Sequence, residues 1–235
     1  MSGNESFEAS HTPFNLEKYG RSPYEIKRAD IIRRLIPSGD GGRALDVGCG
    51  PGFFSRELAA RGWSATAIDT DPSNLELAQP FVKETRCGDA LTVLPQLLAG
   101  SFKLALALEI IEHMPETRGK TLLAELARIL EKHGRLIIST PNKHSPEGLG
   151  DYYWGEKIRR QERWDAWDPT HVKIYSALEL LRLLRSSGFV IERVTGYHYR
   201  GRLPLLGRWQ LPVVATCHAP LNRLGFNVIV ECRLA

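Results

Sequence analysis

Short apolar blocks and amphipathic blocks alternate along most of this chain. The apolar blocks predict strands at 44–47, 63–68, 85–87, 102–108, 135–139, 189–197 and 226–233. Apolar residues at helical spacing between them predict helices at 24–36, 53–60, 73–82, 117–132 and 177–187. A strand–helix alternation of this kind predicts an α/β protein with a doubly wound sheet. The almost purely apolar block 102–108 is typical of a central parallel strand.

Two segments interrupt the alternation. Residues 141–172 and 198–225 are long connections that we expect to be cap insertions on a single domain spanning 1–235. Aromatic residues are dense in the first segment, and arginine, tryptophan and proline mark the second; such loops are typical of substrate-binding regions. The residues are Tyr152, Tyr153, Trp154, Trp164 and Trp167, then Arg200, Arg202, Arg208 and Trp209.

Composition narrows the class of protein without fixing its function. The 235 residues are 43% hydrophobic and 25% charged, which is typical of a globular chain with one sizeable core. No apolar run reaches the roughly 20 residues of a membrane-spanning helix, and the polar start of the chain does not resemble a secretory signal. The four cysteines form no C-x-x-C pair, so we expect reduced thiols and a cytoplasmic protein.

A glycine cluster follows the first predicted strand and precedes a predicted helix. Gly48, Gly50 and Gly52 allow the backbone to turn sharply and to approach a ligand closely. Strand, turn and helix in this order predict a site for a nucleotide-like ligand. Phe53 stands where a dinucleotide fingerprint has a third Gly or Ala, and Asp46 precedes the loop. Both features argue against a dinucleotide-binding dehydrogenase or a nucleotide-sensing module, which is the alternative from another class.

The run Leu45-Asp-Val-Gly-Cys-Gly-Pro-Gly52 resembles motif I of the class I S-adenosylmethionine-dependent methyltransferases. The resemblance covers about 28–190, and within the class it is nearest to ubiquinone-biosynthesis O-methyltransferases. It implies a mostly parallel, seven-stranded, Rossmann-like sheet with an antiparallel last strand. It also implies that the loop holds the methionine part of S-adenosylmethionine and that Asp46 faces the cofactor's amino group.

Further cofactor contacts follow from the same resemblance. An arginine at the position of Arg28 meets the cofactor carboxylate in these enzymes, although Arg28 could equally belong to a solvated basic helix face. Asp69, about 20 residues past the loop, is placed to bind ribose hydroxyls. Asp89 is expected at the adenine amino group, with a turn residue as its alternative. The predicted cofactor-binding set is Arg28, Asp46, Gly48, Gly50, Gly52, Asp69, Asp89, Ala90, Leu108 and Glu109.

Two histidines are candidates for proton transfer. His113 follows the fourth predicted strand, and His171 lies in the run Asp168-Pro-Thr-His171. Both segments should face the ligand crevice, and an imidazole titrates near neutral pH, as a general base requires. Either histidine could instead have a structural role.

The same region carries a second pattern, Glu109-x-x-Glu112-His113 followed later by His171. It resembles the metal site of small-RNA 3′-end 2′-O-methyltransferases, in which two glutamates and two histidines hold a divalent ion. Some ubiquinone O-methyltransferases with this pattern are expected to use Mg²⁺. The metal set, if that interpretation holds, is Glu109, Glu112, His113 and His171. Against it, histidines are unusual ligands for Mg²⁺.

Taken together, the sequence predicts an S-adenosylmethionine-dependent methyltransferase that methylates a hydroxyl of a small molecule. The basic and aromatic segment 198–225 favours an anionic, aromatic or lipid-linked acceptor. A divalent-metal-dependent RNA 2′-O-methyltransferase is the alternative within catalysis. The mild net charge of +4 argues against a nucleic acid acceptor.

Overall fold

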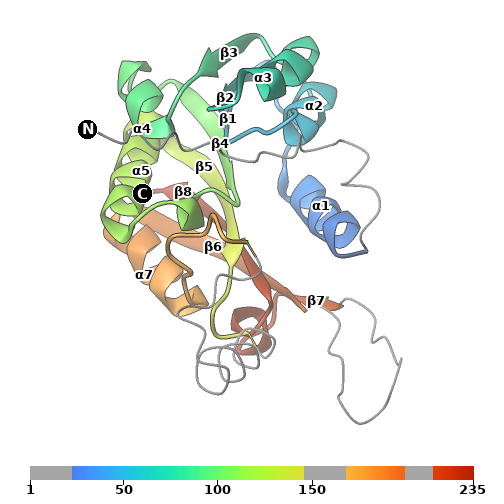
Figure 1. Cartoon of the computed structure of the whole chain (residues 1–235), viewed down its shortest axis with the longest axis vertical. Helices are drawn as coiled ribbons and strands as arrows, with labels where there is room; N and C mark the ends of the chain where they lie inside the picture. The colour runs from blue at the N-terminus through green and yellow to red at the C-terminus, as the bar shows by residue number, and fades with distance from the viewer. Residues whose placement is uncertain (1–22, 146–167, 199–213) are drawn as a thin grey trace, which may run out of the picture.

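A computed structural model describes residues 23–145, 168–198 and 214–235. Its strands form one eight-stranded sheet in the order β3-β2-β1-β4-β5-β8-β6-β7 (Figure 1). The strands are β1 (Arg43–Val47), β2 (Ser64–Asp69), β3 (Glu84–Cys87), β4 (Phe102–Leu108), β5 (Leu130–Pro141), β6 (Phe189–His198), β7 (Val214–Thr216) and β8 (Asn227–Leu234).

Helices cover both faces of this sheet. In Figure 1, α4, α5 and α7 lie on one side and α1, α2 and α3 on the other. The α-helices are α1 (Pro23–Leu35), α2 (Phe53–Ala60), α3 (Pro72–Ala78), α4 (Ala90–Val93), α5 (Glu116–Ile129) and α7 (Ala177–Ser186). Short 3₁₀ turns are η2 (Gln79–Phe81), η3 (Leu94–Gln96), η4 (Ile111–His113) and η6 (Leu221–Arg223). The five predicted helices are confirmed with ends that shift by a few residues, and α4 was not predicted because it is one turn long.

Strand directions confirm the predicted sheet and correct its strand count. β3, β2, β1, β4 and β5 pair in parallel, whereas β8 runs antiparallel to both β5 and β6. The antiparallel last strand is therefore confirmed. The prediction of seven strands is wrong, because β7 pairs antiparallel with the end of β6. β7 lies inside the segment 198–225 and has three residues, too few to show a period of two in the sequence.

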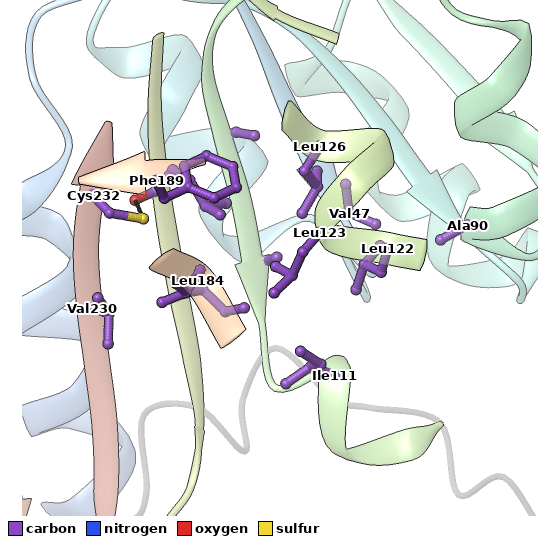
Figure 2. Packing of buried hydrophobic residues seen from close by; sticks show 14 of the residues in the cluster. Val47, Ala90, Ile111, Leu122, Leu123, Leu126, Leu184, Phe189, Val230 and Cys232 are labelled. Atoms are coloured by element: carbon purple, nitrogen blue, oxygen red, sulfur yellow. Dashed lines mark hydrogen bonds between the residues drawn. The ribbon is translucent and has the colours of Figure 1, made fainter. Parts of the chain in front are cut away.

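Both faces of the central strand are buried, which explains why β4 reads as an unbroken apolar run. Leu104 and Leu106 pack in one layer with α1 and α2. Ala105 and Ala107 point the other way and pack in the layer that contains α5 and α7. Figure 2 shows this second layer, where Leu122, Leu123 and Leu126 of α5 meet strand residues and Ile111 of η4.

Much of the two predicted cap insertions lies outside the described residues. This holds for the aromatic cluster at 152–167 and for the arginines and Trp209 of the segment 198–225. The division into one domain with two caps therefore stays a prediction. Within the described ranges, none of the helices has the length and apolarity needed to span a membrane.

Gly52 is the point where the glycine loop packs against α3. It has φ 83°, and a Cβ at this position would lie 2.6 Å from Cα of Ala78. Gly62 has nearly the same φ, 81°, but a Cβ there would meet nothing within 4 Å. Gly62 is thus a matched control that carries the same backbone strain without the steric clash.

We expect Gly62→Ala to lower the free energy of unfolding by about 1 kcal/mol, the cost of a left-handed alanine. Gly52→Ala should lower it by roughly 1–3 kcal/mol more, because α3 must move away from the loop. Urea denaturation of both variants measures the difference. Equal losses would show that α3 does not restrain the loop.

Candidate active site

The glycine loop bends over the carboxyl end of β2. The backbone N–H groups of Gly48 and Cys49 both donate to the Ile68 carbonyl, at 2.8 and 3.0 Å. The next N–H, from Gly50, donates to Oδ2 of Asp69 at 2.8 Å. A Cβ on Gly50 would meet no atom within 4 Å, so the loop has open space beside it. This is the edge at which open α/β sheets bind ligands.

Asp46 lies beneath the loop and is 2% exposed. Its Oδ2 accepts a hydrogen bond of 2.7 Å from the Ser55 hydroxyl of α2. Burial raises the pKa of Asp46 to about 6, against the smaller opposing effect of the Ser55 hydrogen bond. The site therefore contains a carboxylate that a nearby cation would stabilise in its ionised form.

Asp69 holds the loop and does not cap the following helix. Besides the Gly50 N–H, its carboxylate accepts from the backbone N–H of Asp71 at 2.9 Å and from the Asn74 amide at 3.3 Å. The N-cap of α3 is Asp71, whose side chain accepts from the Ser73 N–H. The alternative role of Asp69 as a helix cap is therefore wrong, while its contact with ribose stays a prediction.

Asp89, Ala90 and Leu108 lie around the same edge. Asp89 caps α4 by accepting from the Leu91 N–H at 2.8 Å, and it also forms an ion pair with Arg118 of α5. Asp89 is therefore the N-cap of α4, with an extended backbone, and the alternative that it serves as a turn residue is wrong. Ala90 and Leu108 are both 8% exposed. Contacts of all three with the cofactor stay predictions.

The Glu109 side chain contacts residues from three other elements: β5, β8 and α1. Glu109 has a φ of 54°, unusual for a residue with a side chain, directly after β4. Its carboxylate accepts from the Ser139 hydroxyl of β5 at 2.6 Å and from the Asn227 amide of β8 at 2.7 and 2.8 Å. Nη1 of Arg28, on α1, lies 3.5 Å from its Oε2.

The position of Arg28 decides between its two predicted environments. Arg28 is 7% exposed, so the alternative that it belongs to a solvated basic face is wrong. On the same helix, Arg34 pairs with Asp30 at the surface, and Arg33 pairs with Glu57. Arg28 instead lies beside Glu109 at the carboxyl end of β4, and its contact with the cofactor's carboxylate stays a prediction.

Glu112 is fully buried on the other side of the same turn. Its Oε2 accepts from the Thr140 hydroxyl at 3.0 Å, and Oε1 has no hydrogen-bond partner among the described residues. Burial, followed by the neighbouring charge of Glu109, raises the pKa of Glu112 well above its usual range. Its carbonyl accepts the N–H groups of Val172 and Lys173, which fixes the segment after His171 against η4.

The two candidate histidines are brought together. The ring centroids of His113 and His171 are 4.8 Å apart, although 58 positions separate the residues (171 − 113). Nδ1 of His113 lies 3.0 Å from the Thr170 hydroxyl, which donates to Oδ1 of Asp168 at 2.6 Å. Partial desolvation and the neighbouring His171 lower the pKa of His113, which favours a neutral imidazole at pH 7.

Three of the four predicted metal ligands meet in this place. One ligand atom from each of Glu112, His113 and His171 lies within 4.8 Å of the others. Glu109 is not part of this group, because its carboxylate is engaged by Ser139, Asn227 and Arg28. Two imidazoles and one carboxylate suit an ion such as Zn²⁺ better than Mg²⁺, which prefers six oxygens.

The sequence assigned no role to the residues that hold these groups in place. Ser139 and Thr140 are neighbours at the end of β5, so their side chains point to opposite faces, one to Glu109 and one to Glu112. Asn227, at the start of β8, was not singled out at all. A signal existed in the first case, because hydroxyls at the carboxyl end of a buried apolar strand are unusual there. Nothing local marks Asn227.

The fold and the glycine loop define a class of α/β proteins that bind a nucleoside-containing ligand at the strand ends. The family model for the methyltransferase domain matches residues 21–194. The chain therefore belongs to the methyltransferase domain family.

Known relatives agree with this assignment. A ubiquinone biosynthesis O-methyltransferase of Xanthomonas axonopodis pv. citri is 30% identical over 81% of this chain and 80% of its own length. One from Psychrobacter arcticus is 28% identical over 73% of this chain; the chain spans 66% of that enzyme's length.

Solved structures share the fold at lower identity. A SAM-dependent methyltransferase from Archaeoglobus fulgidus has a TM-score of 0.65 and 20% identity, covering 92% of this chain and 96% of its own. The N-methyltransferase NodS from Bradyrhizobium japonicum, solved with S-adenosyl-L-homocysteine, has a TM-score of 0.61 and 16% identity and covers 92% and 90%.

Asp46 gives the free protein a specific pH dependence. Its folded pKa of about 6 lies above the unfolded value near 3.8, so its contribution to stability is complete below pH 4. That contribution is lost as pH rises through 6. We expect Asp46→Asn, which stays neutral and can still accept from Ser55, to be more stable than the wild type at pH 7.5 by up to about 3 kcal/mol. Urea unfolding at pH 4 and pH 7.5 tests this, and parallel pH profiles would contradict it.

Proposed function

We propose that this chain methylates a hydroxyl group of a small molecule and that His113 accepts the proton. The observation that carries the proposal is the arrangement of the crevice. Asp46 and Asp69 lie at the glycine loop, and Glu109 follows the neighbouring strand β4. His113 lies one turn beyond Glu109, with the ring of His171 against its own. The residues proposed to bind the cofactor thus adjoin the residues proposed to move the proton, at the carboxyl ends of neighbouring parallel strands.

The described residues fit S-adenosylmethionine. The open space beside Gly50 allows backbone to approach the ligand closely. The Asp69 carboxylate is partly exposed and retains acceptor capacity for ribose hydroxyls. Buried Asp46 supplies the negative charge that an ammonium would pair with, and Arg28 supplies the positive charge for a carboxylate.

When bound, S-adenosylmethionine supplies an electrophilic methyl group on a sulfonium. The protein then has to align the acceptor oxygen behind that carbon and remove the hydroxyl proton. In that reaction the acceptor oxygen would take the methyl group, and the electron pair of the S–CH₃ bond would stay on sulfur. The hydroxyl proton passes to the unprotonated nitrogen of His113. His171, with its ring against His113, supports that ring and borders the acceptor side.

The acceptor class rests on chemistry and on the relatives. The Xanthomonas and Psychrobacter enzymes are named as ubiquinone biosynthesis O-methyltransferases, which supports a phenolic hydroxyl as the acceptor. A phenol is more acidic than an aliphatic alcohol, so a neutral imidazole suffices as its base. The basic segment 198–225 is expected to favour an anionic or lipid-linked phenol.

Asp69→Ala should weaken binding of S-adenosylhomocysteine by roughly 1–3 kcal/mol, because a charged hydrogen bond to ribose and the support of Gly50 are both lost. Asp71→Ala is the matched control. It removes the cap of α3 and should lower stability by about 1 kcal/mol while leaving affinity nearly unchanged. Isothermal titration calorimetry compares the two. Equal affinities for both variants would remove Asp69 from the site.

A second candidate is transfer assisted by a divalent ion, including transfer to an RNA 2′-hydroxyl. The cluster of Glu112, His113 and His171 is the observation that favours it. An ion held there would lower the pKa of a coordinated hydroxyl. The donor types make Zn²⁺ a better match than Mg²⁺.

Calorimetry of metal-stripped protein with Mg²⁺ and with Zn²⁺ separates the two candidates. The metal-free proposal predicts no binding of Mg²⁺ and the same affinity for S-adenosylhomocysteine with or without it. Binding of Mg²⁺ that is lost in Glu112→Gln would favour the metal-assisted candidate. Binding of Zn²⁺ alone, without an effect on turnover, would mark an incidental site.

A further inference from the structure

Three side chains form a hydrogen-bonded chain that ends on the candidate base. The Asp168 carboxylate accepts the Thr170 hydroxyl at 2.6 Å and the Thr170 N–H at 2.9 Å. The same hydroxyl oxygen lies 3.0 Å from Nδ1 of His113. Asp168 and Thr170 belong to the turn before His171, whereas His113 belongs to η4. These hydrogen bonds therefore link two segments that are distant in sequence.

Counting hydrogens along this chain fixes the tautomer of His113. A threonine hydroxyl carries one hydrogen, and an oxygen–oxygen distance of 2.6 Å to a carboxylate requires that hydrogen to lie between the two oxygens. The Thr170 oxygen can then only accept from the imidazole. The hydrogen of neutral His113 must therefore be on Nδ1, and Nε2 must carry the free lone pair.

The surroundings are consistent with that assignment. Desolvation raises the pKa of Asp168, but the hydrogen bonds from Thr170 and the charges of the two histidines together lower it below its usual value. The Asp168 side chain is therefore a hydrogen-bond acceptor at neutral pH. Its Oδ2 lies 4.0 Å from Nε2 of His171, so one carboxylate faces both rings. Within residues 23–145, 168–198 and 214–235, Nε2 of His113 has no hydrogen-bond partner.

We propose that Thr170 and Asp168 are positioning residues that hold His113 in the Nδ1–H tautomer and so direct its Nε2 lone pair to the acceptor hydroxyl. The arrangement is an Asp–Thr–His relay, in which the hydroxyl transmits the orienting effect of the carboxylate. The inference rests on the proposed function, because the base matters only if a proton has to leave the acceptor. Thr170 and Asp168 thereby determine which nitrogen of His113 is basic.

The tautomer can be read without any substrate. Long-range ¹H–¹⁵N correlation spectra of histidine-labelled protein distinguish a protonated nitrogen from a bare one at each ring. The chain has 7 histidines, and the signal lost in His113→Gln identifies the ring in question. We expect a protonated Nδ1 and a bare Nε2 for neutral His113. A protonated Nε2 in the wild type would overturn the inference.

Three variants test the relay itself. Thr170→Val keeps the shape but has no hydroxyl, so His113 should shift toward the Nε2–H form. Thr170→Ser keeps the hydroxyl and should retain the wild-type spectrum. Asp168→Ala frees the hydroxyl to donate to Nδ1, which should also favour Nε2–H although Thr170 is present. A Thr170→Val spectrum identical to that of the wild type would overturn the inference.

Catalysis provides the second measurement, with catechol as the probe acceptor and radiolabelled S-adenosylmethionine as the donor. Thr170→Val should lower kcat by about 10-fold or more with KM for the cofactor unchanged, and Thr170→Ser should restore most of it. A changed tautomer with unchanged kcat would overturn the positioning role. Failure of the wild type to bind S-adenosylhomocysteine would instead contradict the proposed function, and the spectra would still decide whether the relay exists.

Discussion

The contacts of the Glu109 carboxylate are the interactions on which the candidate site depends. Glu109 sits on a left-handed backbone turn directly after β4 and joins that strand to β5 through Ser139, to β8 through Asn227 and to α1 through Arg28. A half-buried carboxylate without partners would be unfavourable, and here three other elements supply the partners: β5, β8 and α1. The turn that Glu109 stabilises also sets the direction of η4, and hence the places of Glu112 and His113.

The candidate site has two halves, one on each side of Glu109. Toward β1 and β2, the glycine loop and two aspartates form an edge with open space beside Gly50. Toward β5, the chain returns through 168–176, and its N–H groups bond to the Glu112 carbonyl. That contact brings His171, Thr170 and Asp168 against His113. The sheet thus places the proposed cofactor-binding residues beside the proposed acid–base residues, all on one sheet among the described residues.

Local sequence patterns predicted the features that depend on residues close together in the chain. The strands, the long helices, the glycine loop and the acids at the strand ends all follow from periodicity or short motifs. The burial of Arg28 did not, because its helix carries other basic residues that do face solvent. Nor did the support of Glu109 by Asn227, 118 positions away, or of His113 by Thr170, 57 positions away. Such pairs are set by tertiary packing, which no local pattern records.

The central claim is that the crevice binds S-adenosylmethionine and not a dinucleotide. A comparison of melting temperatures with S-adenosylhomocysteine and with NAD tests it most directly, because only a ligand of the folded state raises the midpoint of unfolding. The account predicts a clear rise with S-adenosylhomocysteine and none with NAD. A rise with NAD alone would contradict it.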